Sequence, residues 1–152
     1  QLVSFTTRKK RTGEVHGEDY YFVDESELEN LDIVEETSYS GNKYGLLREV
    51  VNKFLGENNN TYFIANADGA KQIQNMYPDE TIPLWLKTDI STMRSRMYLR
   101  GDSERNIQKR ILYAVDNDEL SQPDLEGLVV LDANKTPEEL IKQVLYILKR
   151  RG

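Results

Sequence analysis

The sequence predicts an α/β fold in which a parallel sheet is flanked by helices and a small mixed β lobe is inserted near its beginning. From Tyr62 onward, short apolar runs alternate with amphipathic helical patterns. That order is typical of parallel strands joined by right-handed crossovers. Residues 8–60 instead combine short strand and turn patterns, which indicates the inserted lobe.

The first predicted elements are short. Residues 2–7 alternate and are partly β-branched, and residues 20–23 are mostly aromatic, so both segments are predicted strands. The acidic run that begins at Asp24 favours the first turn of a short helix. Residues 32–39 are predicted to form the next strand.

In the middle of the chain, turn-forming residues at 40–43 precede an apolar spacing over 46–55 that is typical of a helix. The polar run at 57–60 is predicted to be a loop, and residues 61–65 are predicted to be a buried strand. A helical pattern follows over 67–76 and ends before a proline.

In the last third of the chain, the predicted elements again alternate between strand and helix. They are a strand at 81–86, helices at 89–98 and 102–119, and an apolar strand within 125–131. Thr88 or Asp89 is the predicted cap of the first of these helices. A final helix is predicted to open at Thr136, because a proline and two acidic residues follow it.

Composition excludes several classes of protein. The chain has 152 residues, of which 38% are hydrophobic and 30% charged, and this is typical of one globular domain. A net charge of −6 argues against a nucleic-acid partner. There is no cysteine and one histidine, His16, and no metal site is predicted. Because no apolar run approaches the ~18 residues of a membrane helix and no signal peptide opens the chain, we expect a cytoplasmic protein without a membrane partner.

The stretch from Ser4 to Phe22, SFTTRKKRTGEVHGEDYYF, concentrates the residues of a potential anion site. Arg8 and Arg11 lie three residues apart, a turn-forming Thr-Gly pair follows, and Tyr20 begins an aromatic run. Two guanidinium forks and a phenol that converge can bind a dianionic phosphate. The same spacing also fits a solvated hairpin, which is the more common structure for a basic turn before an aromatic strand.

Within this stretch, the spacing T-T-R-x-x-R-x-G-E-x-x-G-x-D-Y-x-F closely resembles the monophosphate-binding signature of guanylate kinases, and the similarity extends with gaps over nearly all of the chain. The resemblance implies a fold of the P-loop-kinase type. It also implies a division into a core strand at 1–7, a monophosphate-binding lobe at 8–60, core segments at 61–88 and 111–152, and a lid region at 89–110.

The resemblance implies a binding site for the acceptor nucleotide GMP. Its contacts to the phosphate would be Ser4, Arg8, Arg11, Tyr20 and Tyr44. For either tyrosine alone, packing within a small β lobe is an equally good explanation, and the pair of arginines favours the functional one.

Glu35 matches the carboxylate that reads the base in this family. Guanine presents two adjacent donors on its Watson–Crick edge, and one carboxylate can accept both. Adenine has no such pair, and a buried polar group left unpaired is costly. Because Glu35 and Glu36 are neighbours on a predicted strand, they must point to opposite faces, and only one can meet the ligand. The alternative for Glu35 is the solvated face, which we expect for Glu36.

Three positions depart from the family pattern. Leu46 stands where a serine is frequent, which removes a possible guanine contact. Asn66 occupies an acidic position, where its amide oxygen can still accept one bond from guanine, and Asp68 stands where glutamine is usual. Leu46 and Asn66 leave room for a different phosphate ester as the acceptor.

Residues 93–102 resemble the lid of the family. The arginines for which the resemblance implies a catalytic role are Arg96, Arg100 and Arg110. Such residues stabilise charge on the transferring phosphoryl group and act on an element that closes over the substrate. Arg94 and Arg105 fit better as part of a basic helix face paired with acidic neighbours.

No stretch matches G-x-x-x-x-G-K-[ST], the loop whose amides and lysine hold the donor phosphates. In the family that loop lies before the position of Gln1, so we expect the chain to be part of a longer protein. The alternative is a stand-alone, degenerate relative. The intact protein is expected to transfer a phosphoryl group from ATP to GMP with Mg²⁺. The second hypothesis is an inactive guanylate-kinase-like module that binds a phosphorylated peptide or another phosphate ester.

Overall fold

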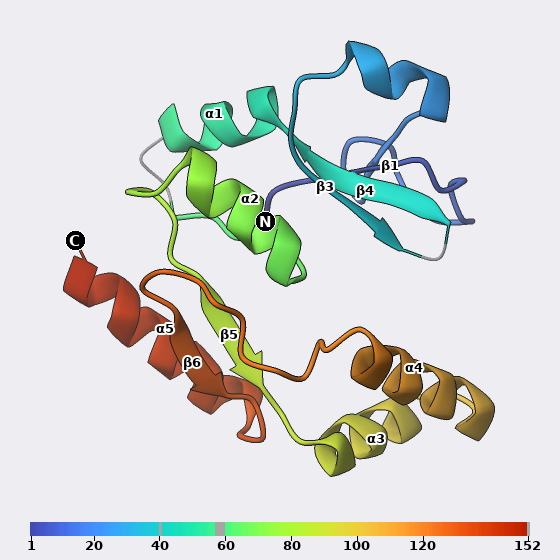
Figure 1. The fold of residues 1–152 in the computed structure, drawn as a ribbon, viewed down its shortest axis with the longest axis vertical. Helices are drawn as coiled ribbons and strands as arrows, with labels where there is room; N and C mark the ends of the chain where they lie inside the picture. Colours follow the sequence, from blue (N-terminus) through green and yellow to red (C-terminus); the bar gives the residue numbers. More distant parts are fainter. Residues whose placement is uncertain (40, 57–59, 152) are drawn as a thin grey trace. The chain divides into compact units, whose positions relative to one another are not determined.

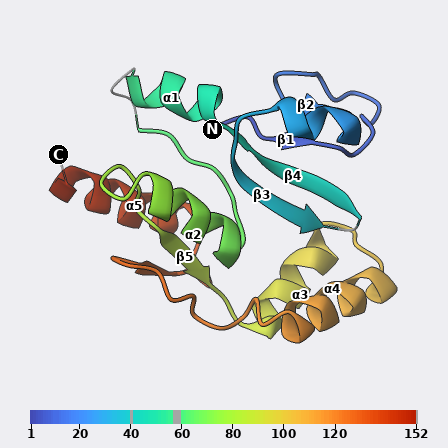
Figure 2. The same cartoon turned by 45° about the horizontal axis from the view of Figure 1, so that its top comes forward.

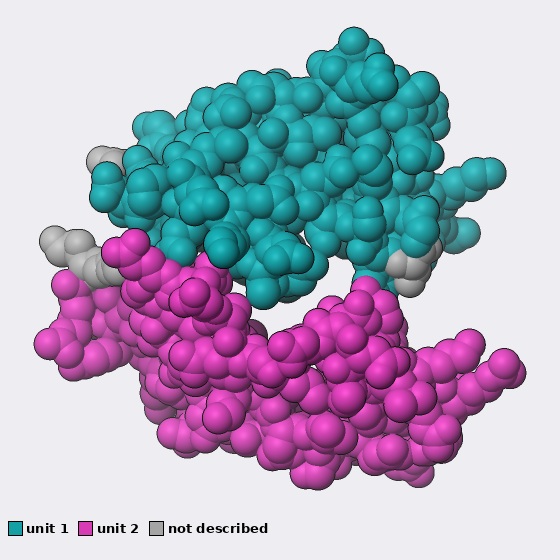
Figure 3. Space-filling model, in the orientation of Figure 1, with its two compact units in different colours: residues 1–81 teal, residues 82–152 magenta. Residues whose placement is uncertain are grey.

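The computed structural model describes residues 1–39, 41–56 and 60–151. The chain forms two compact units, Gln1–Thr81 and Ile82–Gly152, which are coloured separately in Figure 3. Within the described residues, the first unit contains a four-stranded sheet and the second a two-stranded sheet (Figure 1). Each unit therefore has its own framework, and the elements of each are given in turn.

The sheet of the first unit is mixed, as predicted for this part of the chain. Its strands, in spatial order, are β2 (Tyr21–Phe22), β1 (Phe5–Thr6), β4 (Asn42–Leu47) and β3 (Ile33–Tyr39). The β1 strand pairs in parallel with β2 and antiparallel with β4, and β3 pairs antiparallel with β4. The two long strands, β3 and β4, run side by side (Figure 2).

The predicted helix over 46–55 begins later than expected, because its first residues belong to β4. Leu46 and Leu47 pair with Glu35 and Ile33 across the sheet, and helix α1 then runs from Arg48 to Gly56. Two adjacent leucines fit the start of a helical apolar stripe as well as the end of a strand. The pairing with β1 and β3 decides between the two.

Two other predicted elements differ in extent or type. The strand expected at 2–7 is reduced to β1, and residues 61–65 form no strand, although the Leu2 amide donates to the Tyr62 carbonyl at 2.9 Å. One such bond does not make a ladder. The helix expected from Asp24 is a 3-10 helix, η1 (Glu25–Asn30), and it opens with a capping box. The predicted loop at 57–60 lies, except for Asn60, outside the described residues.

Helix α2 (Ala67–Met76) has the predicted bounds and lies against the outer edge of β3. The Gln72 side chain bonds to both backbone groups of Glu36: its Oε1 accepts from the Glu36 amide at 3.0 Å, and its Nε2 donates to the Glu36 carbonyl at 3.1 Å. An edge strand exposes such groups, so this side chain satisfies part of the open edge.

The core of the first unit lies between the sheet, η1, α1 and α2. Its buried residues are Leu2, Phe5, Leu28, Val34, Leu46, Leu47, Val50, Val51 and Ile73. Burial of these apolar side chains is the main contribution to the stability of the unit.

Gly45 is required by close packing in this core. A Cβ atom at this position would lie 2.0 Å from the Glu35 carbonyl oxygen and 2.7 Å from the Phe5 ring. We expect Gly45→Ala to lower the free energy of unfolding by about 3 kcal/mol, the upper end of the usual range for an added methyl group in a packed core. Urea denaturation would measure the change. Gly56→Ala is the matched control, because a Cβ atom there meets nothing within 4 Å. Equal stability of the two variants would contradict the prediction.

The second unit contains a parallel pair of strands, β5 (Leu84–Lys87) and β6 (Val129–Asp132), which confirms the predicted parallel arrangement. Its helices are α3 (Ile90–Leu99), α4 (Glu104–Asp116) and α5 (Pro137–Arg151). Helices α3 and α4 lie side by side, and α4 ends earlier than the predicted Glu119 because Asn117 caps it. Among the described residues, no helix combines the length and the apolar character that a membrane span requires.

The sequence-predicted helix starts of this unit are present. Asp89 caps α3 by accepting a hydrogen bond from the Thr92 amide at 2.7 Å. Thr136 and Glu139 form a reciprocal capping box at the start of α5, with distances of 3.0 and 3.3 Å. These contacts are local in sequence, which explains why the sequence pattern could predict them.

Candidate functional site

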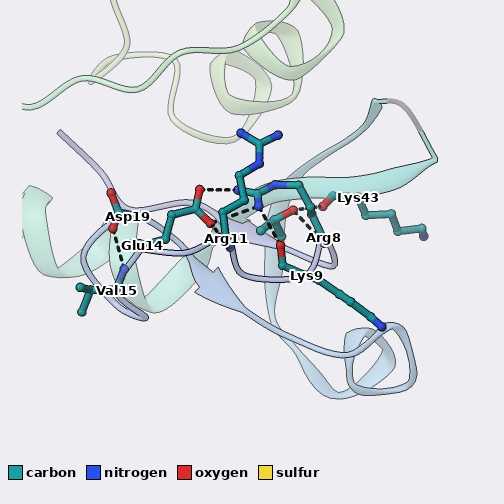
Figure 4. Close-up of polar contacts among 8 residues, drawn as sticks. Arg8, Lys9, Arg11, Glu14, Val15, Asp19 and Lys43 are labelled. Carbon is teal, nitrogen blue, oxygen red and sulfur yellow. Dashed lines mark hydrogen bonds and ion pairs between the residues drawn. The ribbon is translucent and has the colours of Figure 1, made fainter.

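Arg8 is held by a bidentate ion pair in the loop that follows β1 (Figure 4). Its Nη2 donates to Glu14 Oε1 at 2.7 Å and its Nη1 to Glu14 Oε2 at 3.1 Å. Nη1 also donates to the Lys9 carbonyl at 2.7 Å. The hydrogen bonds to Arg8 hold the pKa of Glu14 below its usual value, and Glu14 raises the pKa of Arg8. Both side chains therefore stay charged.

Glu14 and the Lys9 carbonyl occupy three of the donors of the Arg8 guanidinium. Arginine has five such N–H donors in all. Glu14 occupies the end of the fork between Nη1 and Nη2. The remaining donors are Nε–H and the second hydrogen of Nη2, which form the side of the fork. Tyr44 shares this side through a side-chain hydrogen bond to Arg8. A phosphate that bound there with two parallel hydrogen bonds would replace that bond.

Aromatic rings surround the same guanidinium. The Arg8 Cζ atom lies 5.5 Å from the Tyr20 ring centroid and 5.8 Å from that of Phe22, within the range of cation–π attraction. The Tyr20 and Tyr44 rings are 6.0 Å apart in an edge-to-face arrangement, and a hydrogen bond with Tyr44 contributes to the raised pKa of Arg8. Arg8, Tyr20 and Tyr44 therefore form one cluster, here called the anion cluster.

Arg11 lies in the same loop, but Glu14 holds its backbone rather than its side chain. The Arg11 amide donates to Glu14 Oε2 at 2.7 Å, while its exposed guanidinium extends away from that carboxylate (Figure 4). Ser4 is half-buried beside β1, and its carbonyl accepts from the Tyr21 amide at 2.9 Å. The loop thus places one ordered and one extended guanidinium near the anion cluster.

Among the described residues of this unit, Glu35 is the buried carboxylate, with 4% of its surface exposed. A bulge shifts the register of β3 between Ile33 and Glu35, so that Val34 and Glu35 are both buried although they are neighbours. Burial, and to a smaller extent the charge of Glu36, raises the pKa of Glu35 to about 7. Glu36 is the partly exposed neighbour and pairs with Lys43 at 2.9 Å, as expected for the opposite face.

Glu35 and Tyr44 project from the same face of the sheet. Glu35 is paired with Leu46 and Thr37 with Tyr44, and residues that are paired, or two apart on a strand, share a face. Glu35 and Tyr44 are therefore diagonal cross-strand neighbours, about 7–8 Å apart. The buried acid and Tyr44, a member of the anion cluster, therefore lie on one face of the sheet.

The comparisons with known proteins agree on one family. The sequence model of the guanylate kinase family matches residues 1–150. The chain belongs to the guanylate kinase family. The guanylate kinase of Lactobacillus johnsonii is 33% identical over 148 residues, covering 94% of this chain and 72% of that protein. The guanylate kinase of a Thermus thermophilus strain is 30% identical over 167 residues, covering 98% of this chain and 76% of that protein.

A solved structure supports the fold of this guanylate kinase family member. The crystal structure of guanylate kinase from Anaplasma phagocytophilum matches with a TM-score of 0.67 and 25% sequence identity. The match covers 98% of this chain and 73% of that chain. The α/β fold of the P-loop-kinase type that the sequence predicts is therefore confirmed.

Asn66, one of the departures from the family pattern, is engaged within the first unit. Its Oδ1 accepts from the Gly69 amide at 2.9 Å as the N-cap of α2, and its Nδ2 donates to Thr37 Oγ1 at 2.9 Å. The oxygen that we expected to accept from guanine thus already has one donor, although a carbonyl oxygen can accept a second. Leu46, a second departure, is fully buried in the core.

The arginines predicted for the lid lie in the second unit. Arg100 forms an ion pair with Asp102, and Arg96 donates to the Lys135 carbonyl at 3.2 Å. Arg110 is exposed on α4, and Arg94 pairs with Glu104. The ion pair of Arg94 is the structural role expected for it, and the catalytic roles of Arg96, Arg100 and Arg110 stay predictions.

Two residues of this site were missed by sequence reasoning. Glu14 is present in the quoted signature but was given no role, although a carboxylate six residues after Arg8 is a clear candidate partner. Gly69 lies against Glu35, and its ideal Cβ position is 2.4 Å from Glu35 Oε1. Gly69 falls on the final glycine of the family pattern D-x-D-x-Q-G, but the sequence alone does not show that it contacts Glu35.

Proposed function

We propose that this protein phosphorylates GMP to GDP at the expense of ATP, and that its first unit binds the acceptor nucleotide. Membership of the guanylate kinase family and the fold match support this activity. The observation that carries the assignment of the site is the placement of Glu35 and Tyr44, a member of the anion cluster, on one face of the sheet. One end of that surface suits a dianion, and the other suits a base with two adjacent donors.

In this proposal each group has a separate task. The Arg8 and Arg11 guanidinium groups and the hydroxyls of Tyr20 and Tyr44 bind the phosphate, together with Ser4. Glu14 keeps the Arg8 fork oriented before the substrate arrives, which reduces the entropy lost on binding. Together they place the acceptor phosphate in a fixed position for transfer.

Glu35 reads the base in this proposal, because an ionised carboxylate can accept both guanine donors and carries no donor of its own. Asn66 can add one acceptor from the helix cap. The arginines proposed for the lid, Arg96, Arg100 and Arg110, would stabilise charge on the phosphoryl group in transit.

The donor side does not fit the residues of this chain. Guanylate kinases use ATP and Mg²⁺, but residues 1–152 contain no G-x-x-x-x-G-K-[ST] loop. The described residues also hold no group of three His, Cys, Asp or Glu side chains that could bind a metal ion. We therefore assign this chain the acceptor and lid functions only. A cytoplasmic location, expected from the sequence, stays a prediction.

Titration of the complete gene product with three ligands tests the proposal. We expect GMP to bind more tightly than AMP, and both to bind more tightly than a phosphoserine peptide. A coupled assay should then show GMP-dependent consumption of ATP. Preference for the phosphoserine peptide, without turnover, would replace the enzyme by the binding module of the second hypothesis.

The raised pKa of Glu35 predicts how GMP binding depends on pH. Below pH 7 the carboxyl group gains a proton and becomes a donor facing a guanine donor. GMP affinity is therefore expected to fall as the pH decreases from 8 to 6, approaching about tenfold per unit below the pKa. Calorimetric titration across this range would measure it. Glu35→Gln should lack the pH dependence that arises from Glu35. The variant therefore separates this effect from the protonation of the phosphate itself. A pH slope in Glu35→Gln as steep as that of wild type would contradict the assignment.

The same shift predicts the opposite pH dependence for stability. The folded protein binds this proton more tightly than the unfolded chain, whose glutamate titrates near 4.5. The contribution of Glu35 to stability is therefore fully present below pH 4.5 and is lost as the pH rises to about 7, by about 3 kcal/mol in total. Urea denaturation of wild type and Glu35→Gln at pH 5 and 8 would measure the difference. A wild type that gains stability relative to the variant at pH 8 would contradict it.

A further inference from the structure

Gly69 lies directly against the carboxyl group of Glu35. It is the third residue of α2, and an ideal Cβ atom built on it would be 2.4 Å from Glu35 Oε1 and 3.1 Å from Glu35 Cδ. The third neighbour, the Cβ atom of Ala65, would be at 3.2 Å. A side chain at position 69 therefore cannot coexist with the present position of the Glu35 carboxylate.

Backbone conformation does not explain a glycine at this position. Gly69 is not among the glycines with positive φ, and helix propensity favours alanine inside a helix. Close packing against Glu35 is the remaining physical reason. A hydrogen atom in place of a methyl group lets the carboxylate approach the first turn of α2, where the helix dipole favours a negative charge.

The two glycines that flank Glu35 differ in what a methyl group would displace. At Gly45 the added atom would meet a backbone oxygen, so the strand itself would have to move. At Gly69 it would meet the free end of a side chain, which can rotate away. Substitution at position 69 should therefore spare the fold and move the carboxylate.

We propose that Gly69 is a positioning residue for base recognition: the lack of a side chain there keeps the Glu35 carboxylate in the place from which it selects guanine. This inference rests on the proposed function, because it takes Glu35 as the group that reads the base. It adds a specificity determinant that does not itself touch the nucleotide.

The test compares Gly69→Ala with wild type in the complete gene product. We expect the ratio of GMP to AMP affinity to fall at least about tenfold, with affinity for inorganic phosphate within about twofold of wild type and the denaturation midpoint unchanged or higher. The matched control is Gly56→Ala in α1, where the new methyl group contacts nothing within 4 Å, and it should change none of these.

Two further measurements show whether Gly69 acts through Glu35. In ¹³C NMR titrations, the pKa of the Glu35 carboxyl should move from about 7 toward the ordinary value of 4.5 in Gly69→Ala, because the displaced group reaches water. In the Glu35→Gln background, Gly69→Ala should cause no further loss of GMP preference, which is the non-additivity expected of coupled residues.

The outcomes separate this inference from the function on which it rests. If Glu35→Gln removes the GMP preference and Gly69→Ala leaves both the preference and the Glu35 titration unchanged, the role of Gly69 is overturned and the proposed function stands. If neither variant changes the preference, Glu35 does not read the base and both ideas fail. Loss of the fold in Gly69→Ala would also overturn the role of Gly69. It would mean that the Glu35 side chain cannot rotate away from the added methyl group.

Discussion

Arg11→Ala is expected to weaken GMP binding by about 10- to 150-fold while leaving the fold intact. A hydrogen bond to a charged group contributes about 1.5–3 kcal/mol, and 1.4 kcal/mol corresponds to a tenfold change in affinity. The loop should survive the change, because Glu14 is bonded to the Arg11 amide and not to its guanidinium. Arg8→Ala would be a less clean test, since it also removes the partner of Glu14. Isothermal titration with GMP measures the loss.

The matched control for this prediction is Arg48→Ala. Arg48 is a partly exposed arginine of the same unit, and it pairs with Asp32 at 2.8 Å outside the anion cluster. Its removal takes one positive charge from the unit, as Arg11→Ala does, so a general electrostatic effect would appear in both variants. Equal weakening of GMP binding by Arg48→Ala and Arg11→Ala would mean that Arg11 makes no specific contact with the phosphate.

The parts of the fold that the sequence predicted well are those decided by neighbours in the chain. Helix α2 and the caps at Asp89 and Thr136 follow from contacts over three or four residues. The β4 strand was missed because its pairing partners are distant in sequence. A segment of only six residues is too short for its apolar pattern to distinguish a strand from the start of a helix.

In the site, too, the features set by nearby residues could be predicted and those set by distant residues could not. The arginine spacing and the carboxylate at position 35 could be read from the motif. The bulge that buries Glu35 next to Val34 could not, because it arises from the register with β4. The contact between Gly69 and Glu35 joins residues far apart in the chain, and only the packing of α2 on β3 reveals it.

Glu35→Gln is expected to remove most of the preference for GMP over AMP while leaving phosphate binding nearly unchanged. Glutamine keeps the size of the side chain but replaces one acceptor oxygen with a donor, which then faces a guanine donor. We expect GMP affinity to fall about 10- to 150-fold at pH 8, where the native carboxyl group is ionised. AMP should not bind more weakly, since an amide can both donate to and accept from the adenine edge. Competition titrations with GMP, AMP and inorganic phosphate measure the three affinities.

Glu36→Gln provides the comparison that makes this result specific. The two acids are adjacent on β3, but Glu36 is partly exposed and pairs with Lys43 on the opposite face. Both substitutions remove one negative charge from nearly the same place, so a long-range electrostatic effect on the phosphate would be similar in the two variants. If Glu35 contacts the base directly, only Glu35→Gln should lower the preference for GMP. A loss of phosphate affinity in Glu35→Gln as large as its loss of GMP affinity would instead place Glu35 among the groups that organise the anion cluster.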